Sequence, residues 1–250
     1  MNIAVFDTET IGLEKCFCYN VGVVIANTES GEILARQEWI VEQIWHNTPL
    51  FETAYYATKK PIYIKRMRAR QAKMDKWGYI MRDMRRLFQE YEVCAAYAYN
   101  RPFDEKGFNF NCDWLKTQNH FDEIPIFDIR GYVHNGLCWT QDFQDFCEVN
   151  QRFTETGNYS TTAETVYQYI SNEENFEEEH TALADSVIEW EILKYCVANG
   201  CEWNANYKVY RSISRKTERE LTVITREGET HNFKYEKMTF SKAKSKITLK

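Results

Sequence analysis

The sequence lacks any long hydrophobic run. Its N-terminal apolar stretch covers only Ile3 to Phe6, and charged residues follow at once. A signal peptide needs an apolar region of ~7–15 residues, so this pattern does not match one. No stretch approaches the ~20 apolar residues that a transmembrane helix requires. We therefore expect a cytoplasmic protein with no membrane partner.

The eight cysteines lack the C-x-x-C spacing that is typical of zinc sites. Cys16 and Cys18 form a C-x-C pair, and the other six are scattered along the chain. Disulfide frameworks belong mainly to smaller secreted proteins. We expect these cysteines to be reduced and mostly buried thiols.

Internal repeats and low-complexity segments are also lacking. The chain has 250 residues, of which 44% are hydrophobic and 27% are charged, as in globular proteins. This length suits one large α/β domain, or one domain of average size with an appendage.

Charge is distributed unevenly along the chain. Residues 200–250 contain 12 Lys and Arg against 6 Asp and Glu, whereas residues 1–199 contain 19 against 31. A basic tail on an acidic body fits an anionic partner such as nucleic acid. A solvated surface whose charge aids solubility explains the same asymmetry equally well.

The pattern of apolar residues predicts an α/β fold. Three strands are expected near the N-terminus, at residues 2–7, 19–27 and 32–44. Helical spacing follows from about 49 to 91, and two further strands at 93–99 and 124–130 alternate with helical segments. The sequence therefore predicts a mixed five-stranded sheet flanked by helices.

The last helical segment ends near Gly200, a residue type that commonly follows a helix. We therefore expect one domain over residues 1–200, with a basic helical insertion at about 45–92. Residues 201–250 are predicted to form a small, basic, β-rich C-terminal extension. Its expected strands lie at 207–213, 220–228 and 230–240.

Acidic residues stand at the end of the first predicted strand. Asp7 and Glu9 are two positions apart in the stretch AVFDTET, so a strand would place both on one face. Their like charges repel unless a cation, a proton or a basic side chain offsets them. Two later stretches carry further candidates: YNRPFDEKGF contains Asp104, and EEHTALADS contains His180 and Asp185.

Together these stretches resemble the three sequence blocks of the DEDDh 3′–5′ exonucleases. This ribonuclease H-like family includes proofreading epsilon subunits and ribonuclease T. Its blocks D-x-E-T-x-G, N-x-x-F-D and H-x-A-x-x-D are similar to Asp7–Gly12, Asn100–Asp104 and His180–Asp185. The resemblance covers roughly residues 1–200.

Two positions depart from the family pattern. Ile11 stands where the family often has a threonine, and Tyr99 stands where it commonly has a histidine. Neither position supplies a metal ligand in the family, so we expect altered substrate contacts rather than lost chemistry. A sister subclass has a tyrosine four residues before the last aspartate. Thr181 occupies that position here, which favours the histidine subclass.

The resemblance implies a ribonuclease H-like fold and a metal-dependent 3′–5′ exonuclease. Such an enzyme acts on the 3′ end of single-stranded or frayed DNA or RNA and releases 5′ mononucleotides. Asp7, Glu9, Asp104 and Asp185 would be catalytic residues that bind two divalent ions, Mg²⁺ or Mn²⁺, and His180 would be the general base. The chemistry agrees, because Mg²⁺ prefers oxygen ligands and a neutral histidine can accept a proton near neutral pH.

The resemblance also implies a set of substrate contacts. Thr10, Ile11 and Leu13 are expected to lie against the terminal nucleotide, and Asn100 and Phe103 are expected to shape the site.

Residues 59–77 form a basic stretch with interleaved aromatic side chains. Such a stretch could follow a phosphate backbone, and we expect nucleic-acid contacts from Lys65, Arg66, Arg68 and Arg70. The alternative is an amphipathic helix that keeps these side chains on its solvated face.

Several questions stay open at this point. A nucleic-acid-binding or DNA-polymerase-accessory module with weak or no catalysis is the alternative function, although all five family positions are present. Some family members form homodimers and others work within larger complexes, so a homodimer and a polymerase or replication partner are both compatible with the sequence. The C-terminal extension could grip a duplex, dock a partner or cover a sheet edge.

Overall fold

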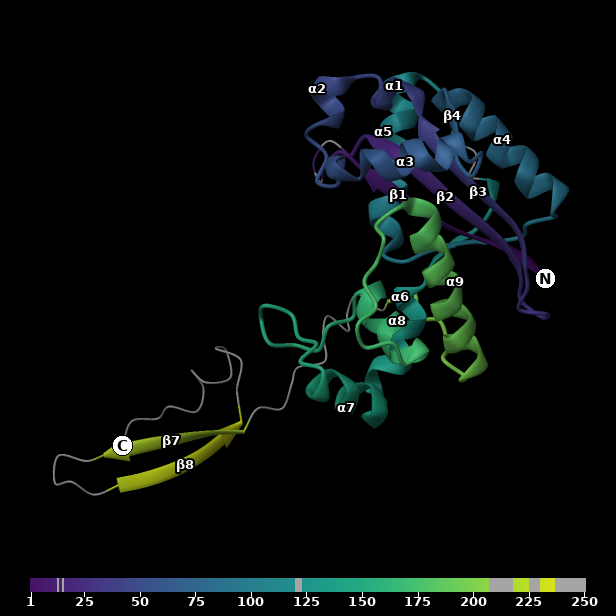
Figure 1. Ribbon diagram of the computed structural model, residues 1–250. Coiled ribbons are helices and arrows are strands. Elements are labelled where there is room, and N and C mark those ends of the chain that lie inside the picture. The colour runs from purple at the N-terminus through teal and green to yellow at the C-terminus, as the bar shows by residue number, and fades with distance from the viewer. Residues whose placement is uncertain (13, 15, 120–122, 207–217, 225–229, 237–250) are drawn as a thin grey trace. The chain divides into compact units, whose positions relative to one another are not determined.

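The computed structural model describes residues 1–12, 14, 16–119, 123–206, 218–224 and 230–236 (Figure 1). The chain divides into two units. The larger comprises Met1–Arg152 and Ser160–Arg211, and the smaller comprises Phe153–Tyr159 and Ser212–Lys250.

The larger unit alternates strands with helices. In chain order its elements are β1 (Asn2–Thr10), β2 (Cys18–Asn27), β3 (Ile33–Val41), α1 (Glu42–Trp45), α2 (Thr48–Phe51), η1 (Ala57–Lys59), α3 (Lys60–Arg68), β4 (Lys73–Asp75), α4 (Trp77–Glu90), β5 (Ala96–Ala98), α5 (Arg101–Leu115), β6 (Ile126–Asp128), α6 (Arg130–Asn135), η3 (Leu137–Trp139), α7 (Gln141–Val149), α8 (Ala163–Ser171) and α9 (Ala182–Ala198).

The sheet is mixed, in the order β4-β3-β2-β1-β5-β6. Strands β1 to β3 form an antiparallel meander, and β5 and β6 extend it in parallel from β1. The predicted mixed sheet flanked by helices is confirmed. The predicted number of five strands is wrong, because the three-residue strand β4 adds a sixth by pairing in parallel with β3. So short a strand shows no period of its own within a helical pattern.

Opposite faces of the sheet pack against different helices. On one face, the Phe6 ring of β1 packs against Phe108 of α5 with a centroid distance of 5.7 Å. Trp77 of α4 joins the same contact at 5.2 Å from Phe108. On the other face, α9 crosses β1 and β2. Because strand residues alternate, Asp7 points away from α5 and toward α9.

The segment between β3 and β5 joins the core through aromatic side chains. Tyr19 of β2 lies 5.1 Å from Phe51 and 6.0 Å from Tyr63, measured between ring centroids. Trp45 closes the group at 4.9 Å from Phe51. All four side chains are buried, so helices α1 to α3 are anchored beside the start of β2. Residues 55–60 therefore lie close to the strand that pairs with β1.

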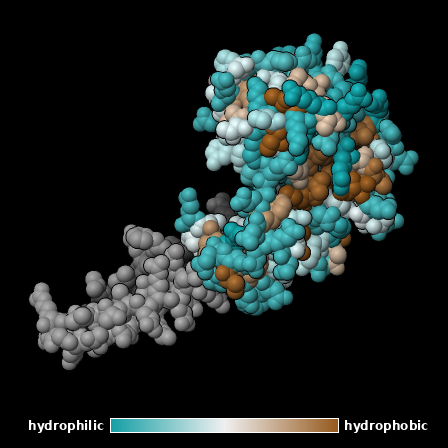
Figure 2. Space-filling model, viewed as in Figure 1, coloured by the Kyte–Doolittle hydropathy of each residue, from teal (hydrophilic) through white to brown (hydrophobic). Residues whose placement is uncertain are grey.

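The surface of the larger unit is mainly hydrophilic on the face drawn in Figure 2. Hydrophobic side chains gather in its middle, where α9 runs. All eight cysteines lie within the described ranges, where none of them forms a disulfide, and most are buried, as expected. None of the helices in the described ranges is long and apolar enough to cross a membrane.

The larger unit continues past residue 200. The indole nitrogen of Trp203 donates to the carbonyl oxygen of Asp128 at 3.3 Å, and its ring packs against Phe127 at 5.0 Å. In the smaller unit, β7 (Glu218–Ile224) and β8 (Thr230–Glu236) form an antiparallel hairpin that overlaps two of the predicted strand segments. The strand expected at 207–213 lies outside the described residues.

Candidate active site

Asp7 and Glu9 lie near the C-terminal end of β1, on the face covered by α9. Asp7 pairs with Gly22 of β2, and Glu9 pairs with Asn20. Glu9 is buried and Asp7 is half-buried. The two carboxylates therefore share one face of the sheet, as their spacing predicted.

The start of α9 is held directly against β2. A Cβ atom on Gly22 would lie 2.1 to 2.2 Å from backbone atoms of Ala182 and Leu183, so only glycine fits there. Beside it, the Asn20 side-chain oxygen accepts the Ala182 N–H at 2.9 Å. Asp185 lies in the first turn of this helix and is buried. The close approach brings its carboxylate to the end of β1.

Three carboxylates converge there. Oxygen atoms of Asp7, Glu9 and Asp185 all lie within 4.8 Å of one another. The Asp185 Oδ1 atom is buried and receives no hydrogen bond from the described part of the chain. A buried acceptor without a donor is unfavourable unless a cation or a proton compensates it.

Asp104 reaches the same strand from the other side of the sheet. Its Oδ1 atom accepts hydrogen bonds from the Thr8 N–H at 3.0 Å and the Thr8 hydroxyl at 2.8 Å. Thr8 stands between the two strand acids, so these bonds place Asp104 next to them. Its negative charge contributes to raising the pKa of Asp7.

Burial and neighbouring negative charges raise the pKa of all four acids. Burial is the main cause in each case, and it raises the pKa of Asp104 to about 8 and that of Asp185 to about 9. The charge of Asp7 adds to the increase for Asp185, whereas the Thr8 hydrogen bonds oppose it for Asp104. The pKa values of Asp7 and Glu9 also lie well above their usual range. The cluster therefore favours bound protons or cations.

His180 stands just before α9, as expected. Its backbone is left-handed, with φ = 52°, and its imidazole stacks on Tyr56 at 4.5 Å with an interplanar angle of 15°. The Nδ1 atom lies 3.5 Å from the Glu178 carboxylate. Burial, then the charge of Lys59, lowers the pKa of His180, while Glu164 opposes that shift. The neutral imidazole is therefore favoured near pH 7.

A second cluster adjoins the first. Ligand atoms of Glu164, Glu178 and His180 lie within 4.8 Å of one another. Burial, with a contribution from Glu164, raises the pKa of Glu178 to about 7. The Glu178 charge in turn raises the pKa of Asp7 and Asp185. Sequence reasoning missed Glu178, because it is one of five glutamates at 173–179 and only packing distinguishes it.

Two residues from the segment between β3 and β5 were also missed. They are Tyr56, which stacks on His180, and Lys59, whose charge lowers the pKa of Glu9 and Asp185. The basic composition of residues 59–77 was the only available signal, and it does not single out Lys59.

The expected nucleotide contacts have different environments. Thr10 is half-buried at the end of β1, and its hydroxyl donates to the Gly12 carbonyl at 3.4 Å. Ile11 is buried in the hydrophobic core. Asn100 is exposed at the start of α5, and Phe103 is half-buried one residue before Asp104. Leu13 lies outside the described residues. The nucleotide contacts of this set stay predictions.

The basic residues on and after α3 fall into two groups. Lys65, Arg68 and Arg70 are exposed. Arg66 instead binds two carboxylates, that of buried Glu38 at 2.9 Å and that of Glu179 at 2.8 Å. A phosphate could bind Arg66 only in competition with these ion pairs.

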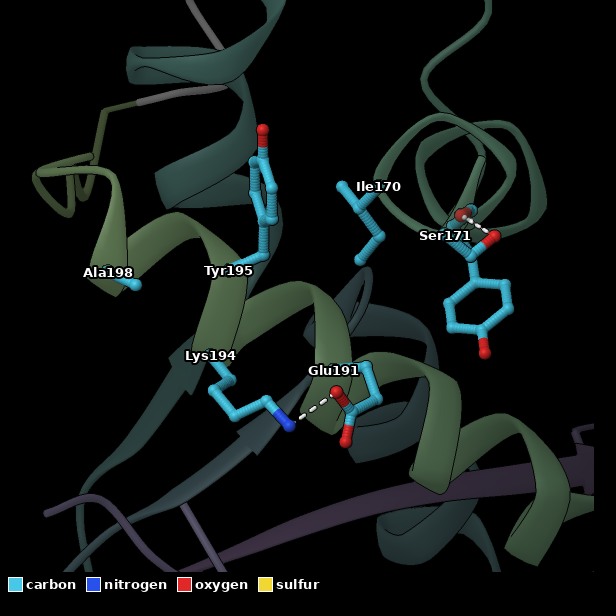
Figure 3. A pocket seen from close by; sticks show the side chains of 7 residues that line it. Ile170, Ser171, Glu191, Lys194, Tyr195 and Ala198 are labelled. Atoms are coloured by element: carbon cyan, nitrogen blue, oxygen red, sulfur yellow. Dashed lines mark hydrogen bonds and ion pairs between the residues drawn. The ribbon is translucent and has the colours of Figure 1, made fainter. Parts of the chain in front are cut away.

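A separate hollow lies between α8 and α9 (Figure 3). It has a volume of about 340 Å³, and Tyr195 and Ile170 lie on its sides. Glu191 and Lys194 form an ion pair at its edge. None of the predicted site residues lines it.

The residues present at the carboxylate cluster fit a divalent cation. All candidate ligands are carboxylate oxygens, which Mg²⁺ and Mn²⁺ prefer. The unpartnered Asp185 oxygen and the raised pKa values show that positive charge would stabilise the cluster.

Solved structures share this architecture. No protein-family model and no curated protein sequence matches the chain. The nuclease domain of 3′hExo, a DEDDh family member bound to rAMP, matches with a TM-score of 0.51 and 14% identity over 81% of this chain and 94% of that one. A 3′-exonuclease recognising a histone mRNA stem-loop has a TM-score of 0.54 and 12% identity, and the match covers 93% of this chain and 90% of that one. A full-length 3′-exonuclease has a TM-score of 0.52 and 14% identity, and the match covers 86% of this chain and 91% of that one.

Each of these matches covers at least 81% of this chain. At 12–14% identity they establish the architecture. The chain therefore has the ribonuclease H-like fold of the DEDDh 3′–5′ exonucleases.

Proposed function

We propose that this protein is a metal-dependent 3′–5′ exonuclease. It would act on the 3′ end of single-stranded or frayed nucleic acid and release 5′ mononucleotides. One observation carries the proposal: carboxylate oxygens of Asp7, Glu9 and Asp185 converge within 4.8 Å in a chain that shares its fold with known 3′-exonucleases. Asp104 adjoins them from α5, and His180 lies just before α9.

The four acids would hold two divalent cations, Mg²⁺ or Mn²⁺. When bound, such ions activate a water molecule and stabilise charge on the leaving oxygen of a phosphodiester. The protein's own contribution is rigid placement of the ligands. Thr8 fixes Asp104 through two hydrogen bonds, and Gly22 with Asn20 fixes the helix that carries Asp185.

His180 would accept the proton of the attacking water. Its lowered pKa keeps it neutral near pH 7, as a general base requires. Tyr56 and Glu178 orient the ring by stacking and through its Nδ1 atom. The other ring nitrogen is then left for the water.

Nucleic acid would approach across exposed basic side chains. Lys65, Arg68 and Arg70 could follow the phosphates of the strand. One similar structure holds rAMP and another recognises a histone mRNA stem-loop, which supports testing RNA beside DNA.

The test is a timed digest of single-stranded oligonucleotides that carry a 5′ label. We expect a ladder that shortens from the 3′ end by single nucleotides in Mg²⁺ or Mn²⁺, and no digestion in EDTA. A substrate blocked at its 3′ end is the matched control and should persist. Parallel DNA and RNA substrates would give the preferred polymer.

Absence of digestion on both polymers with either metal would contradict the proposal. Binding without digestion would instead indicate the alternative function, a nucleic-acid-binding or polymerase-accessory module.

A further inference from the structure

Lys59 brings a positive charge to the carboxylate cluster. It ends η1, outside the three family sequence blocks. Its ammonium donates to the Glu179 carbonyl, next to His180, and lies 4.8 Å from the centre of the Tyr56 ring. Since Tyr56 stacks on His180, these contacts place Lys59 beside the imidazole.

The same charge acts on the acids. Lys59 lowers the pKa of Glu9, Asp185 and Glu178, opposing the effect of burial in each case. Its charge therefore acts on both acidic clusters.

The neighbouring lysine shows that this placement is specific. Lys60 points into the aromatic group, with its ammonium 5.0 Å from the Trp45 ring and 4.8 Å from the Phe51 ring. Two adjacent lysines thus occupy different environments. The Lys60 ammonium lies over aromatic rings, whereas the Lys59 charge lowers the pKa of the acids. Lys59 ends η1 and Lys60 begins α3.

Charge balance suggests what Lys59 does. The four acids of the proposed metal site carry four negative charges, which two divalent cations would neutralise. A phosphodiester then brings one further negative charge into a partly buried site, where an unpaired charge is costly. The Lys59 ammonium can supply the matching positive charge through hydrogen bonds to phosphate oxygens.

We propose that Lys59 is a substrate-binding residue that contacts the phosphate of the 3′-terminal nucleotide. The inference rests on the proposed function and extends it to a residue of the segment between β3 and β5. Tyr56 acts as its platform, so one ring would position both the phosphate ligand and the general base.

The test uses a mononucleotide, which the enzyme cannot digest further. Binding of AMP and dAMP is measured by calorimetry at a Mg²⁺ concentration that saturates the wild type, with adenosine as the probe that lacks the phosphate. We expect Lys59→Met to weaken AMP and dAMP binding by about ten- to a hundredfold and to leave adenosine binding unchanged. Lys59→Arg should retain most of the affinity, because it keeps the charge.

Lys60→Met is the matched control and should bind AMP as the wild type does. Thermal unfolding of each variant confirms that it is folded. Equal AMP affinity in Lys59→Met and wild type would overturn the inference. A loss that disappears when Mg²⁺ is raised further would also overturn it, since Lys59 would then affect only the metal.

The oligonucleotide digest separates the two proposals. If wild type digests oligonucleotides while Lys59→Met keeps wild-type AMP affinity, only the role of Lys59 is wrong. If wild type neither digests oligonucleotides nor binds Mg²⁺, the proposed function itself is wrong.

Discussion

At the scale of residues, the protein concentrates negative charge that its own hydrogen bonds do not offset. Asp7 and Glu9 already share a strand face, and the fold adds Asp185 within 4.8 Å and Asp104 beside them. Burial then raises every pKa in the group. Bound divalent cations would lower these pKa values again, because they stabilise the charged carboxylates.

The substitution Asp185→Asn tests at a single side chain whether these carboxylates bind divalent cations. The substitution keeps the shape of the side chain but removes the titratable carboxyl group and, with it, a ligand oxygen. Divalent-metal affinity and digestion of oligonucleotides should each fall by more than about a hundredfold, since even residues that only support a metal ligand cost ~10–100-fold. Without metal at pH 8, the variant should unfold at a higher temperature than wild type. Wild type must protonate Asp185 when it folds at this pH, because burial raises its pKa to about 9, and the substitution removes that cost.

Asp113→Asn is the matched control, because Asp113 is an exposed acid on α5. It should change neither metal affinity nor digestion. An Asp185→Asn variant with wild-type metal affinity would remove Asp185 from the site.

Sequence predicted the acids but not their cationic neighbour. Asp7, Glu9, Asp104, His180 and Asp185 were found because each belongs to a short block with fixed spacing. Lys59 and Lys60 are adjacent and chemically identical in sequence. Only the aromatic packing of Tyr56, Trp45 and Phe51 gives them different environments. Local sequence contains no signal for such a difference.

At the scale of elements, the site depends on how closely α9 approaches the sheet. Gly22 leaves room for the backbone of Ala182 and Leu183, and Asn20 accepts the first helical N–H. The same Asn20 side chain donates to the Trp39 carbonyl at 3.0 Å, which links the helix start to β3. The position of Asp185 is thus set by two residues of β2.

Gly22→Ala should separate these elements. The added methyl group would lie 2.1 Å from backbone that cannot rotate away, so the helix start must move. We expect a loss of about 1–3 kcal/mol in the free energy of unfolding, the usual range for overpacking, or more. Divalent-metal affinity should fall as well, because Asp185 moves with the helix.

Gly78→Ala is the control for the loss of a glycine. A Cβ atom there would meet only the Thr117 methyl group at 3.4 Å, and the residue lies in α4. It should leave metal affinity unchanged and stabilise the protein by up to about 1 kcal/mol. A Gly22→Ala variant with wild-type stability and metal affinity would contradict this account of the helix start.

Sequence located most elements, and its errors have a physical origin. The strand predicted at 32–44 ends at Val41, where α1 begins within the same apolar pattern. Strand β4 was missed because three residues cannot establish a period. Both differences concern short elements of three or four residues.

At the scale of the whole molecule, the site exists only because distant segments meet. β1, α5 and α9 supply its acids, while the turn between α2 and α3 supplies Tyr56 and Lys59. The sequence blocks predicted the common fold, and structures at 12–14% identity share it. The packing of residues 45–92 could not be predicted in the same way, because it depends on tertiary contacts to Tyr19.

Protonation gives the fold a pH dependence with a defined sign. In the unfolded chain, Asp and Glu titrate near pH 4. In the fold, Asp104 titrates near 8 and Asp185 near 9. A raised pKa means that the folded state holds protons that the unfolded state has lost. Stability without metal should therefore fall as the pH rises from about 4 to about 9.

The most direct test is thermal unfolding of the wild type with saturating Mg²⁺ and with EDTA, across pH 5 to pH 9. We predict that Mg²⁺ raises the unfolding temperature little near pH 5, where protons occupy the acids, and progressively more toward pH 9. An unfolding temperature that Mg²⁺ leaves unchanged at every pH would contradict the claim that these carboxylates form a metal site.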